Sequence, residues 1–216
     1  MPQGQLVLKP ANLTFEQAAA LPISGFAALQ ALRNTGGVQP GQQVVIIGAS
    51  GGVGSYAVQL AKAFGAEVTG VCSTKSLDLV RSIGADHVID YTQEDFTRTG
   101  QRYDLILEMA GNRSLTDLRR ALTPKGTLVL VGGSGGRWFM GTGSHPSSGG
   151  GVAVRGPTAA LVLLQAKKED LVVLKELIEA GKLTPVIDRT FPLNETPEAI
   201  RYVGERSTQG KTVITV

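Results

Sequence analysis

The sequence predicts an α/β fold in which a doubly wound parallel sheet carries helices on both faces. Strand-like segments alternate with segments of helical periodicity between residues 43 and 131. The apolar runs at 44–47 and 127–131 are continuous rather than alternating. Strands of that kind are buried on both faces, which is typical of a parallel sheet covered by helices. A glycine cluster also joins the first of these strands directly to a helix.

The individual elements follow in a regular order. Thr14 and Gln17 have the spacing of a capping box, so a helix should begin there and end before Pro22. A second helix is expected at 24–34. The expected strands are 43–47, 67–72, 87–90, 103–109, 127–131, 152–155, 185–191 and 212–216, and the expected helices are 52–65, 76–83, 114–122, a helical region at 158–180, and one from Thr196 to about 205.

The glycine cluster has the spacing of a dinucleotide-binding fingerprint. Gly51 and Gly54 stand at the last two glycines of the pattern G-x-G-x-x-G, while Ala49 stands at the first. Small residues at a strand–turn–helix junction let the main chain approach a pyrophosphate, and the new helix presents unpaired N–H groups to it. A Rossmann-type fold that binds a dinucleotide is therefore expected.

The chain divides into three parts on this interpretation. Residues 1–40 form helices that lead into the domain, and 41–184 form the Rossmann dinucleotide-binding domain. Within it, 133–151 is so rich in Gly and Ser that a loop is predicted. Residues 185–216 form a terminal strand–helix–strand.

Composition argues against several other functions. The 21 basic and 18 acidic residues are scattered, without the basic stripe that nucleic-acid binding needs. The chain has no run of 18 apolar residues and no leading signal segment. We therefore expect no membrane association, and we expect a cytoplasmic location. Cys72, His87 and His145 do not form a metal-ligand pattern, and Cys72 is expected to be a buried structural thiol.

The end of the second strand bears on the choice of cofactor. An acidic residue usually stands there to bind the ribose hydroxyls of NAD, but the sequence has Ser73, Thr74 and Lys75 instead. Two hydroxyl donors and a cation suit a 2′-phosphate, which favours NADP(H) over NAD(H). The alternative, that Lys75 is simply a solvated residue opening a helix, stays open.

Other candidates follow the later strands. Tyr91 could lie beside the adenine or its ribose phosphate, or could simply pack. Ala110, Val131 and Gly132 lie in turns after two later strands, where ligands of doubly wound sheets bind, so they should face the nicotinamide half. Turns that need glycine only for a positive φ explain this pattern equally well.

Several segments together resemble a known family. The stretch GASGGVGSYAVQLAKAFGAEVTGVCSTKSLDLVRSIGADHVIDY, with LTFEQAAALPISGFAALQAL before it and GKLTPVIDRTFPLNETPEAI and GKTVITV after it, is similar to zinc-independent medium-chain dehydrogenases/reductases of the quinone oxidoreductase-like group. The resemblance implies a Rossmann fold, NADPH as hydride donor, no zinc, and a homodimer. The function expected from it is that of an NADPH-dependent oxidoreductase, a truncated member of the family, which transfers a hydride to a quinone, an enal or another small carbonyl compound. By position, Ser50, Gly51, Gly52 and Val53 would bind the pyrophosphate, and Ser73, Lys75 and Tyr91 the 2′-phosphate end.

The sequence departs from that family in two places. The family has a substrate domain of roughly 110 residues ahead of the LTFEQAAALP segment, whereas only about ten residues precede it here, so the strands after about 185 should lack partners and favour pairing with another subunit. In addition, the segment at 141–151 is Gly/Ser-rich where the family is apolar and helical.

Three other functions remain to be weighed. An NADP(H)-binding module with little or no catalysis is the main alternative, because neither a proton donor nor an acceptor pocket is evident. The turn around Ser50 also satisfies G-x-S-x-G, the pattern of a serine hydrolase, although neither histidine follows a suitable acid. A short-chain dehydrogenase needs Tyr-x-x-x-Lys, and Tyr56 and Lys62 are six residues apart.

Overall fold

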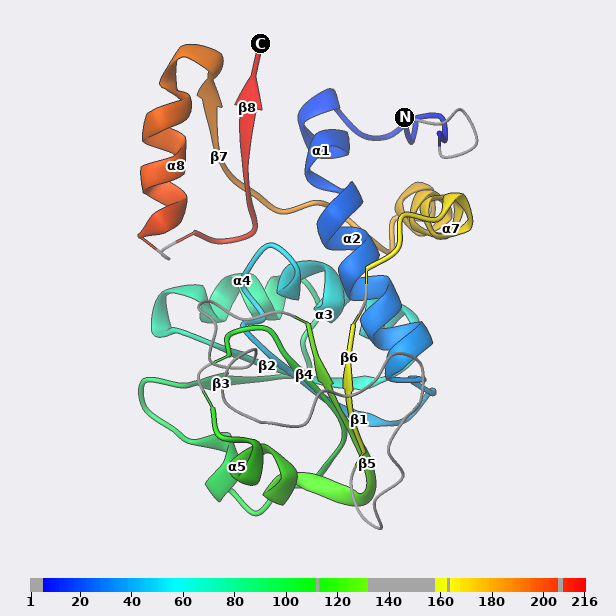
Figure 1. The fold of residues 1–216 in the computed structure, drawn as a ribbon, viewed down its shortest axis with the longest axis vertical. Coiled ribbons are helices and arrows are strands. Elements are labelled where there is room, and N and C mark those ends of the chain that lie inside the picture. Colours follow the sequence, from blue (N-terminus) through cyan, green and yellow to red (C-terminus); the bar gives the residue numbers. More distant parts are fainter. Residues whose placement is uncertain (1–5, 112, 132–157, 163, 206–207) are drawn as a thin grey trace.

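A six-stranded parallel sheet forms the centre of the molecule in the computed structural model, which describes residues 6–111, 113–131, 158–162, 164–205 and 208–216. The strand order is β3-β2-β1-β4-β5-β6 (Figure 1). The strands are β1 Gln43–Ile47, β2 Glu67–Cys72, β3 His87–Asp90, β4 Tyr103–Glu108, β5 Leu122–Leu130 and β6 Thr158–Leu161. All five pairings are parallel, so the predicted doubly wound α/β fold is confirmed.

Helices cover both faces of this sheet. On one face lie α2 (Pro22–Leu29), α3 (Gly54–Ala63), α4 (Leu77–Ser82) and α7 (Lys168–Glu179), and on the other lies α5 (Leu115–Arg120). Strand β1 explains why both faces need cover. Val44 and Ile46 pack into the first cluster of buried side chains, whereas Val45 and Ile47 pack into the second. Successive side chains of a strand point to opposite faces, so a continuous apolar run requires two covering layers.

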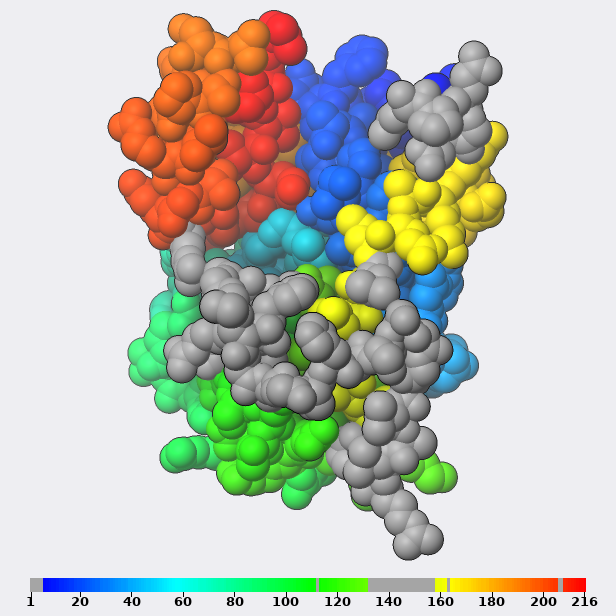
Figure 2. All heavy atoms as spheres, viewed as in Figure 1, coloured from blue at the N-terminus to red at the C-terminus, as the bar shows by residue number. Residues whose placement is uncertain are grey.

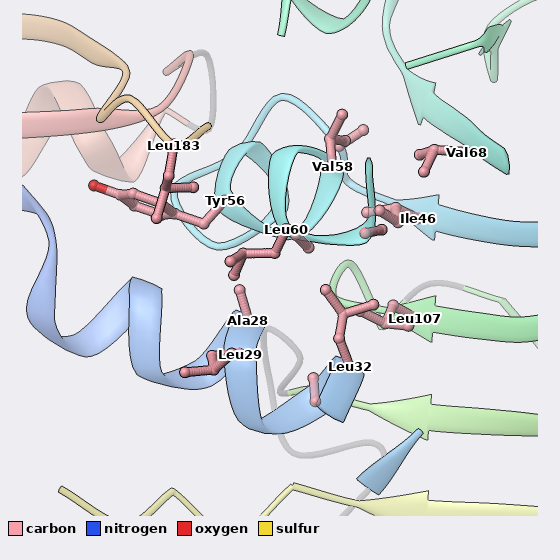
Figure 3. Close-up of a cluster of buried hydrophobic side chains, with 14 of the residues drawn as sticks. Ala28, Leu29, Leu32, Ile46, Tyr56, Val58, Leu60, Val68, Leu107 and Leu183 are labelled. Atoms are coloured by element: carbon pink, nitrogen blue, oxygen red, sulfur yellow. The ribbon is translucent and has the colours of Figure 1, made fainter. Parts of the chain in front are cut away.

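The larger cluster joins the sheet to α2 and α3. In Figure 3, Leu60 of α3 points towards Ala28 of α2, and Leu32 lies beside Leu107 of β4. All four side chains are fully buried. Burying a leucine of this kind stabilises a fold by about 1.5–3 kcal/mol, so the contact of Leu60 fixes α3 against α2.

The N-terminal segment contains a capped helix, as predicted. In α1 (Phe15–Ala20), the N–H of Gln17 donates to Thr14 Oγ1 at 3.2 Å, and the N–H of Thr14 donates to Gln17 Oε1 at 2.9 Å. Pro22 then begins α2, because a proline at the first helical position loses no hydrogen bond. The helix continues as a π-helical segment, Gln30–Thr35.

The C-terminal residues form a smaller unit at one end of the molecule. Strands β7 (Ile187–Pro192) and β8 (Lys211–Thr215) pair in parallel, and α8 (Thr196–Gly204) connects them. Figure 2 shows this orange and red unit beside the blue N-terminal helices, at the end opposite to α5. It corresponds to the strand–helix–strand expected at 185–216. No helix among the described residues is long and apolar enough to cross a membrane.

Short helical turns complete the described chain. They are Thr74–Ser76, Phe96–Arg98 and Leu193–Glu195. The loop predicted at 133–151 and the strand predicted at 152–155 lie outside the described residues.

Two predicted boundaries are wrong. The helical region expected at 158–180 begins with strand β6, which pairs with β5, and only Lys168–Glu179 is helical. A short apolar run does not by itself distinguish a strand from a helix. Residues 158–161 form a strand here because they pair with the edge of β5. Strand β5 also begins at Leu122 instead of 127. Pro124 and Gly126 are unfavourable residues within a strand, but the pairing of Leu122 with Tyr103 outweighs their effect.

Candidate functional site

The carboxyl ends of four neighbouring strands define the candidate site. Ile47 of β1 lies between Val71 of β2 and Glu108 of β4, and Glu108 lies beside Leu130 of β5. The chain runs outward from β1 through β2 to β3 and then returns to β4 on its other side. This reversal of direction is the topological switch point at which doubly wound sheets bind ligands.

The turn after β1 has a geometry that requires glycine at two positions. Gly48 has a φ of +85°, which side chains rarely tolerate. The N–H of Gly51 donates to the carbonyl oxygen of Gly48 at 3.0 Å and so closes the turn. A Cβ placed on Gly54 would lie 2.0 Å from that same carbonyl oxygen. The turn therefore brings its backbone closer to the next helix than any side chain would allow.

Helix α3 begins in this turn without a capping side chain. Val53 occupies the N-cap position, and its apolar side chain makes no capping hydrogen bond. The first N–H groups of a helix have no partner within the helix, so an anion that binds here satisfies them and the helix dipole at once. The predicted residues Ser50, Gly51, Gly52, Val53 and Gly54 all lie in this segment, which fits the pyrophosphate of a dinucleotide.

The end of β2 lies on one side of the glycine turn. The N–H of Gly48 donates to the carbonyl oxygen of Val71 at 3.0 Å, which holds the two strand ends together. Ser73 follows β2, and Thr74 and Lys75 form a short helical turn. Cys72 is buried, as predicted, and burial raises the pKa of its thiol to about 11, so the thiol is protonated near neutral pH.

A carboxylate lies beside this segment that the sequence analysis overlooked. Thr74 Oγ1 donates to Asp90 Oδ2 at 2.5 Å, and the N–H of Thr92 donates to Asp90 Oδ1 at 2.9 Å. The hydrogen bond from Thr74 is the main reason why the pKa of Asp90 lies below its usual value. The absence of an acid at the end of β2 is thus only part of the picture, because β3 brings one. The sequence could have indicated this contact, because β2 and β3 were expected to be successive strands of a parallel sheet, whose ends lie close together.

Tyr91 follows Asp90 directly. Its N–H donates to the carbonyl oxygen of Cys72 at 3.0 Å, and 52% of the residue is exposed. The structure thus places Tyr91 next to the Ser73–Lys75 segment with its surface open to a ligand.

The end of β4 contains a fully buried acid. Glu108 Oε1 accepts hydrogen bonds from the N–H groups of Ala110 at 2.7 Å and Gly111 at 2.9 Å, whereas its Oε2 has no partner among the described residues. Burial raises the pKa of this carboxyl. The N–H of Val131 donates to the carbonyl oxygen of Glu108 at 3.0 Å. Ala110 and Val131 therefore both lie beside Glu108, while Gly132 lies outside the described residues.

The C-terminal unit also reaches the site, and no sequence signal pointed to this. The N–H of Gly210 donates to the carbonyl oxygen of Ser50 at 2.7 Å. Gln209 Nε2 donates to the carbonyl oxygen of Lys75 at 2.9 Å and to Ser76 Oγ at 3.1 Å. Residues 209–210 thereby connect the glycine turn to the segment after β2.

The structure gives little support to the two rival enzyme classes. His87 begins β3, two strands away from β1, and contacts Glu67 at 2.9 Å, and His145 lies outside the described residues. No histidine among the described residues therefore lies beside Ser50 to act as its base. Lys62 pairs with Asp86 at 2.7 Å, and the hydroxyl of Tyr56 is buried.

Comparison with known proteins agrees with this geometry. The chain is 37% identical over 234 residues to mouse "NAD(P)H oxidoreductase RTN4IP1, mitochondrial", covering 96% of this chain and 57% of that protein. It is 33% identical to "NADPH-dependent alkenal/one oxidoreductase, chloroplastic" of Arabidopsis thaliana, covering 97% and 49%. The solved quinone oxidoreductase of Coxiella burnetii superposes with a TM-score of 0.80 at 29% identity, covering 97% and 63%.

The aligned region includes nearly all of this chain but only part of each relative. The chain spans about half to three fifths of the length of these relatives. A family model described as "Zinc-binding dehydrogenase" matches residues 83–214, which is more than half of the chain. The sheet order, the glycine turn at its switch point and this match lead to one conclusion: the chain belongs to the zinc-binding dehydrogenase family.

Proposed function

We propose that this protein is an NADPH-dependent oxidoreductase that transfers a hydride to a quinone, an enal or another small carbonyl compound. The glycine turn at the switch point of the sheet carries this proposal, because its backbone meets the start of α3 so closely that a Cβ at Gly54 would collide with the Gly48 carbonyl oxygen. The names of the mouse and Arabidopsis relatives support a nicotinamide cofactor. The name of the Coxiella protein supports a quinone as acceptor.

Residues at the carboxyl ends of neighbouring strands suit successive parts of such a cofactor. The turn and the start of α3 would hold the pyrophosphate, and the segment after β2 together with Tyr91 the adenosine end. Ala110 and Val131 would border the nicotinamide. When bound, the nicotinamide supplies the hydride, and the protein's own contribution is to hold that ring and the acceptor within reach of each other.

The choice of NADP(H) over NAD(H) rests on a balance of charges. Lys75 provides a cation for a 2′-phosphate, whereas Thr74 donates its one hydroxyl proton to Asp90, whose carboxylate brings a negative charge to the same segment. We propose that the cation prevails, because hydrogen bonds from the Thr74 hydroxyl and the Thr92 N–H offset part of the negative charge of Asp90.

We also propose that the reaction needs no zinc, although the family's description names that metal. Among the described residues, no three side chains of His, Cys, Asp or Glu are placed to hold a metal ion. These residues therefore do not fit a zinc site, and no step here is assigned to a metal.

A cofactor-binding module with little turnover is the second candidate. It is favoured by one observation: Ala110 and Val131, the described residues proposed to border the nicotinamide, have apolar side chains that cannot give a proton to the reduced acceptor. A cytoplasmic location and a homodimer belong to the proposal as well, and the relatives named for mitochondria and chloroplasts give no support to the former.

Two measurements test the proposal. NADPH oxidation, followed by its absorbance with a panel of quinones and enals, should show turnover, while fluorescence titration should show tighter binding of NADPH than of NADH. Lys75→Ala should weaken NADPH by about tenfold to a hundredfold, the worth of a charge-assisted contact, and leave NADH unchanged.

Lys125→Ala serves as the matched control, because Lys125 is an exposed lysine in the early part of β5. It should change neither affinity. Binding without turnover would establish the second candidate instead, and failure to bind either cofactor would overturn both.

A further inference from the structure

An open pocket of about 430 Å³ lies between the end of α5 and the segment that leads into β4. Arginines dominate its lining, and no acidic side chain is among the described residues that line it. The lining residues are Thr97, Arg98, Gly100, Gln101, Arg102 and Arg120. Guanidinium groups stay charged at every physiological pH, and a pocket of about 300–1,000 Å³ is the usual size of a small-molecule site. The lining therefore favours a small anion.

The arginine pocket lies at the opposite end of the sheet from the glycine turn. Arg102 directly precedes β4, whose other end, Glu108, belongs to the candidate functional site. A strand of this length spans roughly 20 Å. Figure 1 shows α5 at the end of the molecule away from the C-terminal unit, whose Gly210 contacts the glycine turn. The pocket is therefore separate from the proposed cofactor site.

The backbone that carries the three arginines is fixed. The N–H of Tyr103 donates to the carbonyl oxygen of Ala121 at 2.8 Å, and these two residues directly follow Arg102 and Arg120. The two arginines are thus held beside each other although they come from different elements. The third belongs to the short helical turn Phe96–Arg98, whose phenyl ring is fully buried and packs on the Tyr103 ring with centroids 6.0 Å apart. A ligand therefore meets a preformed arrangement of donors.

The charges of these arginines are only partly compensated. Arg98 Nε lies 3.7 Å from Asp95 Oδ2, and Arg120 Nη1 lies 3.5 Å from Asp117 Oδ1. Both distances exceed the usual length of an N–H···O hydrogen bond, so the donors of both guanidinium groups remain available. Arg102 forms no ion pair with the described residues.

Asp95 does not cancel the charge of the pocket either. Its Oδ1 accepts hydrogen bonds from the N–H of Thr97 at 3.0 Å and from Thr97 Oγ1 at 2.8 Å. The same carboxylate oxygen pairs with Arg113, which is not among the lining residues. One negative charge is thus shared between two arginines, and the pocket keeps a positive excess.

We propose that the arginine pocket binds a small molecule that carries a phosphate group. A phosphate is close to a dianion near neutral pH and presents three acceptor oxygens in different directions, which suits guanidinium groups from three separate chain positions. A carboxylate offers one charge and two oxygens in a single plane. The inference goes beyond the proposed function and does not depend on it.

The test is an NMR titration of the whole ¹⁵N-labelled chain with inorganic pyrophosphate at constant ionic strength. The backbone N–H signals of Gly100 and Gln101 report on the arginine pocket, whereas those of Gly51 and Gly52 report on the glycine turn. We expect saturable shifts at Gly100 and Gln101 in the wild type. Acetate should bind there at least about tenfold more weakly, because it carries one charge instead of several.

The double variant Arg102→Gln with Arg120→Gln should bind pyrophosphate in the pocket about tenfold more weakly than the wild type. Arg98→Gln is a second, independent variant and should weaken binding about threefold. Arg81→Gln is the matched control, because Arg81 also pairs with an acid three residues away and is as exposed as Arg120, 57% against 58%. It should bind pyrophosphate as the wild type does.

The remaining outcomes overturn the inference. The absence of saturable shifts at Gly100 and Gln101 in the wild type means that the pocket binds no phosphate. Equal affinity in the arginine variants, or an equal loss in Arg81→Gln, means that the three arginines form no specific site. Acetate that binds as tightly as pyrophosphate refutes the phosphate group as the ligand. Shifts confined to Gly51 and Gly52 refute the arginine pocket alone and leave the proposed function intact.

Discussion

Asp90 and Lys75 oppose each other at the adenosine end of the candidate site. Asp90 carries a negative charge and accepts hydrogen bonds from Thr74 and Thr92. Lys75 carries a positive charge and lies in the short helical turn Thr74–Ser76. Because a 2′-phosphate is a dianion near neutral pH, the two residues act on it with opposite signs. The proposed preference for NADPH is thus a difference between two nearby interactions.

Asp90→Asn tests that difference. Removing the negative charge should tighten NADPH by about fivefold and leave NADH equal or weaker. Fluorescence titration of both cofactors gives the ratio. Glu94→Gln, which alters another exposed acid after β3, should leave the ratio unchanged. A tighter NADH in Asp90→Asn would contradict this account.

Glu108 makes the stability depend on pH in an unusual direction. Burial raises its pKa in the folded state above the value of about 4.3 that a free glutamate has. The folded state therefore binds more protons, so this group's contribution to stability is full at low pH and is lost as pH rises from about 4.3 through the raised pKa.

Glu108→Gln should remove that loss while keeping the amide oxygen that accepts from Ala110 and Gly111. We expect the free energy of unfolding of the variant, relative to wild type, to rise over this pH window by up to about 1.4 kcal/mol per pH unit. Urea unfolding at a series of pH values measures it. Glu108→Ala, which leaves both N–H groups unpaired, should destabilise at every pH. A difference between Gln and wild type that is constant with pH would refute a raised pKa.

At the scale of elements, the glycine turn connects three parts of the fold. It continues β1, bonds to β2 through Gly48 and opens α3 at Gly54. Helix α3 is in turn fixed by Leu60 against α2. The position of the helix N-terminus over the sheet edge therefore depends on the absence of a side chain at Gly54.

Gly54→Ala should disrupt this connection. Its Cβ would lie 2.0 Å from the Gly48 carbonyl oxygen and 2.8 Å from its carbon, so the turn must move. Overpacking of this severity costs about 3 kcal/mol, and cofactor binding should be lost. Thermal unfolding and titration measure the two effects. Gly204→Ala in α8, where a Cβ meets nothing within 4 Å, should be neutral or slightly stabilising. A stable Gly54→Ala variant that binds NADPH would contradict the proposed role of the glycine turn.

At the scale of the whole molecule, the β7–β8 pair leaves strand edges without a partner among the described residues. Two paired strands alone are only marginally stable, and their unpaired N–H and C=O groups can form hydrogen bonds with a strand of another chain. Exposed apolar side chains of α8, Ile200 and Val203, lie in the same unit. These features support the proposal of a homodimer formed through the C-terminal unit.

Light scattering in solution checks this proposal. We expect twice the mass of the chain, and Ile200→Lys with Val203→Lys should reduce it to the mass of one chain without loss of helix content by circular dichroism. Leu161→Lys, at an exposed apolar residue of β6, is the control and should stay dimeric. A wild type that runs as a monomer at all concentrations would refute the dimer.

The sequence determined the fold class, the glycine turn and most element types, because these depend on local patterns: Val44–Ile47 must be covered on both faces, and Gly54 follows a strand and opens a helix. Tertiary structure decided the rest. Residues 158–161 became a strand only because β5 had a free edge, and Asp90 met Thr74 only because β3 pairs with β2. Lys211 reached Gly52 across more than 150 residues of chain. No local pattern encodes such contacts, since they arise from packing between elements that are distant in sequence.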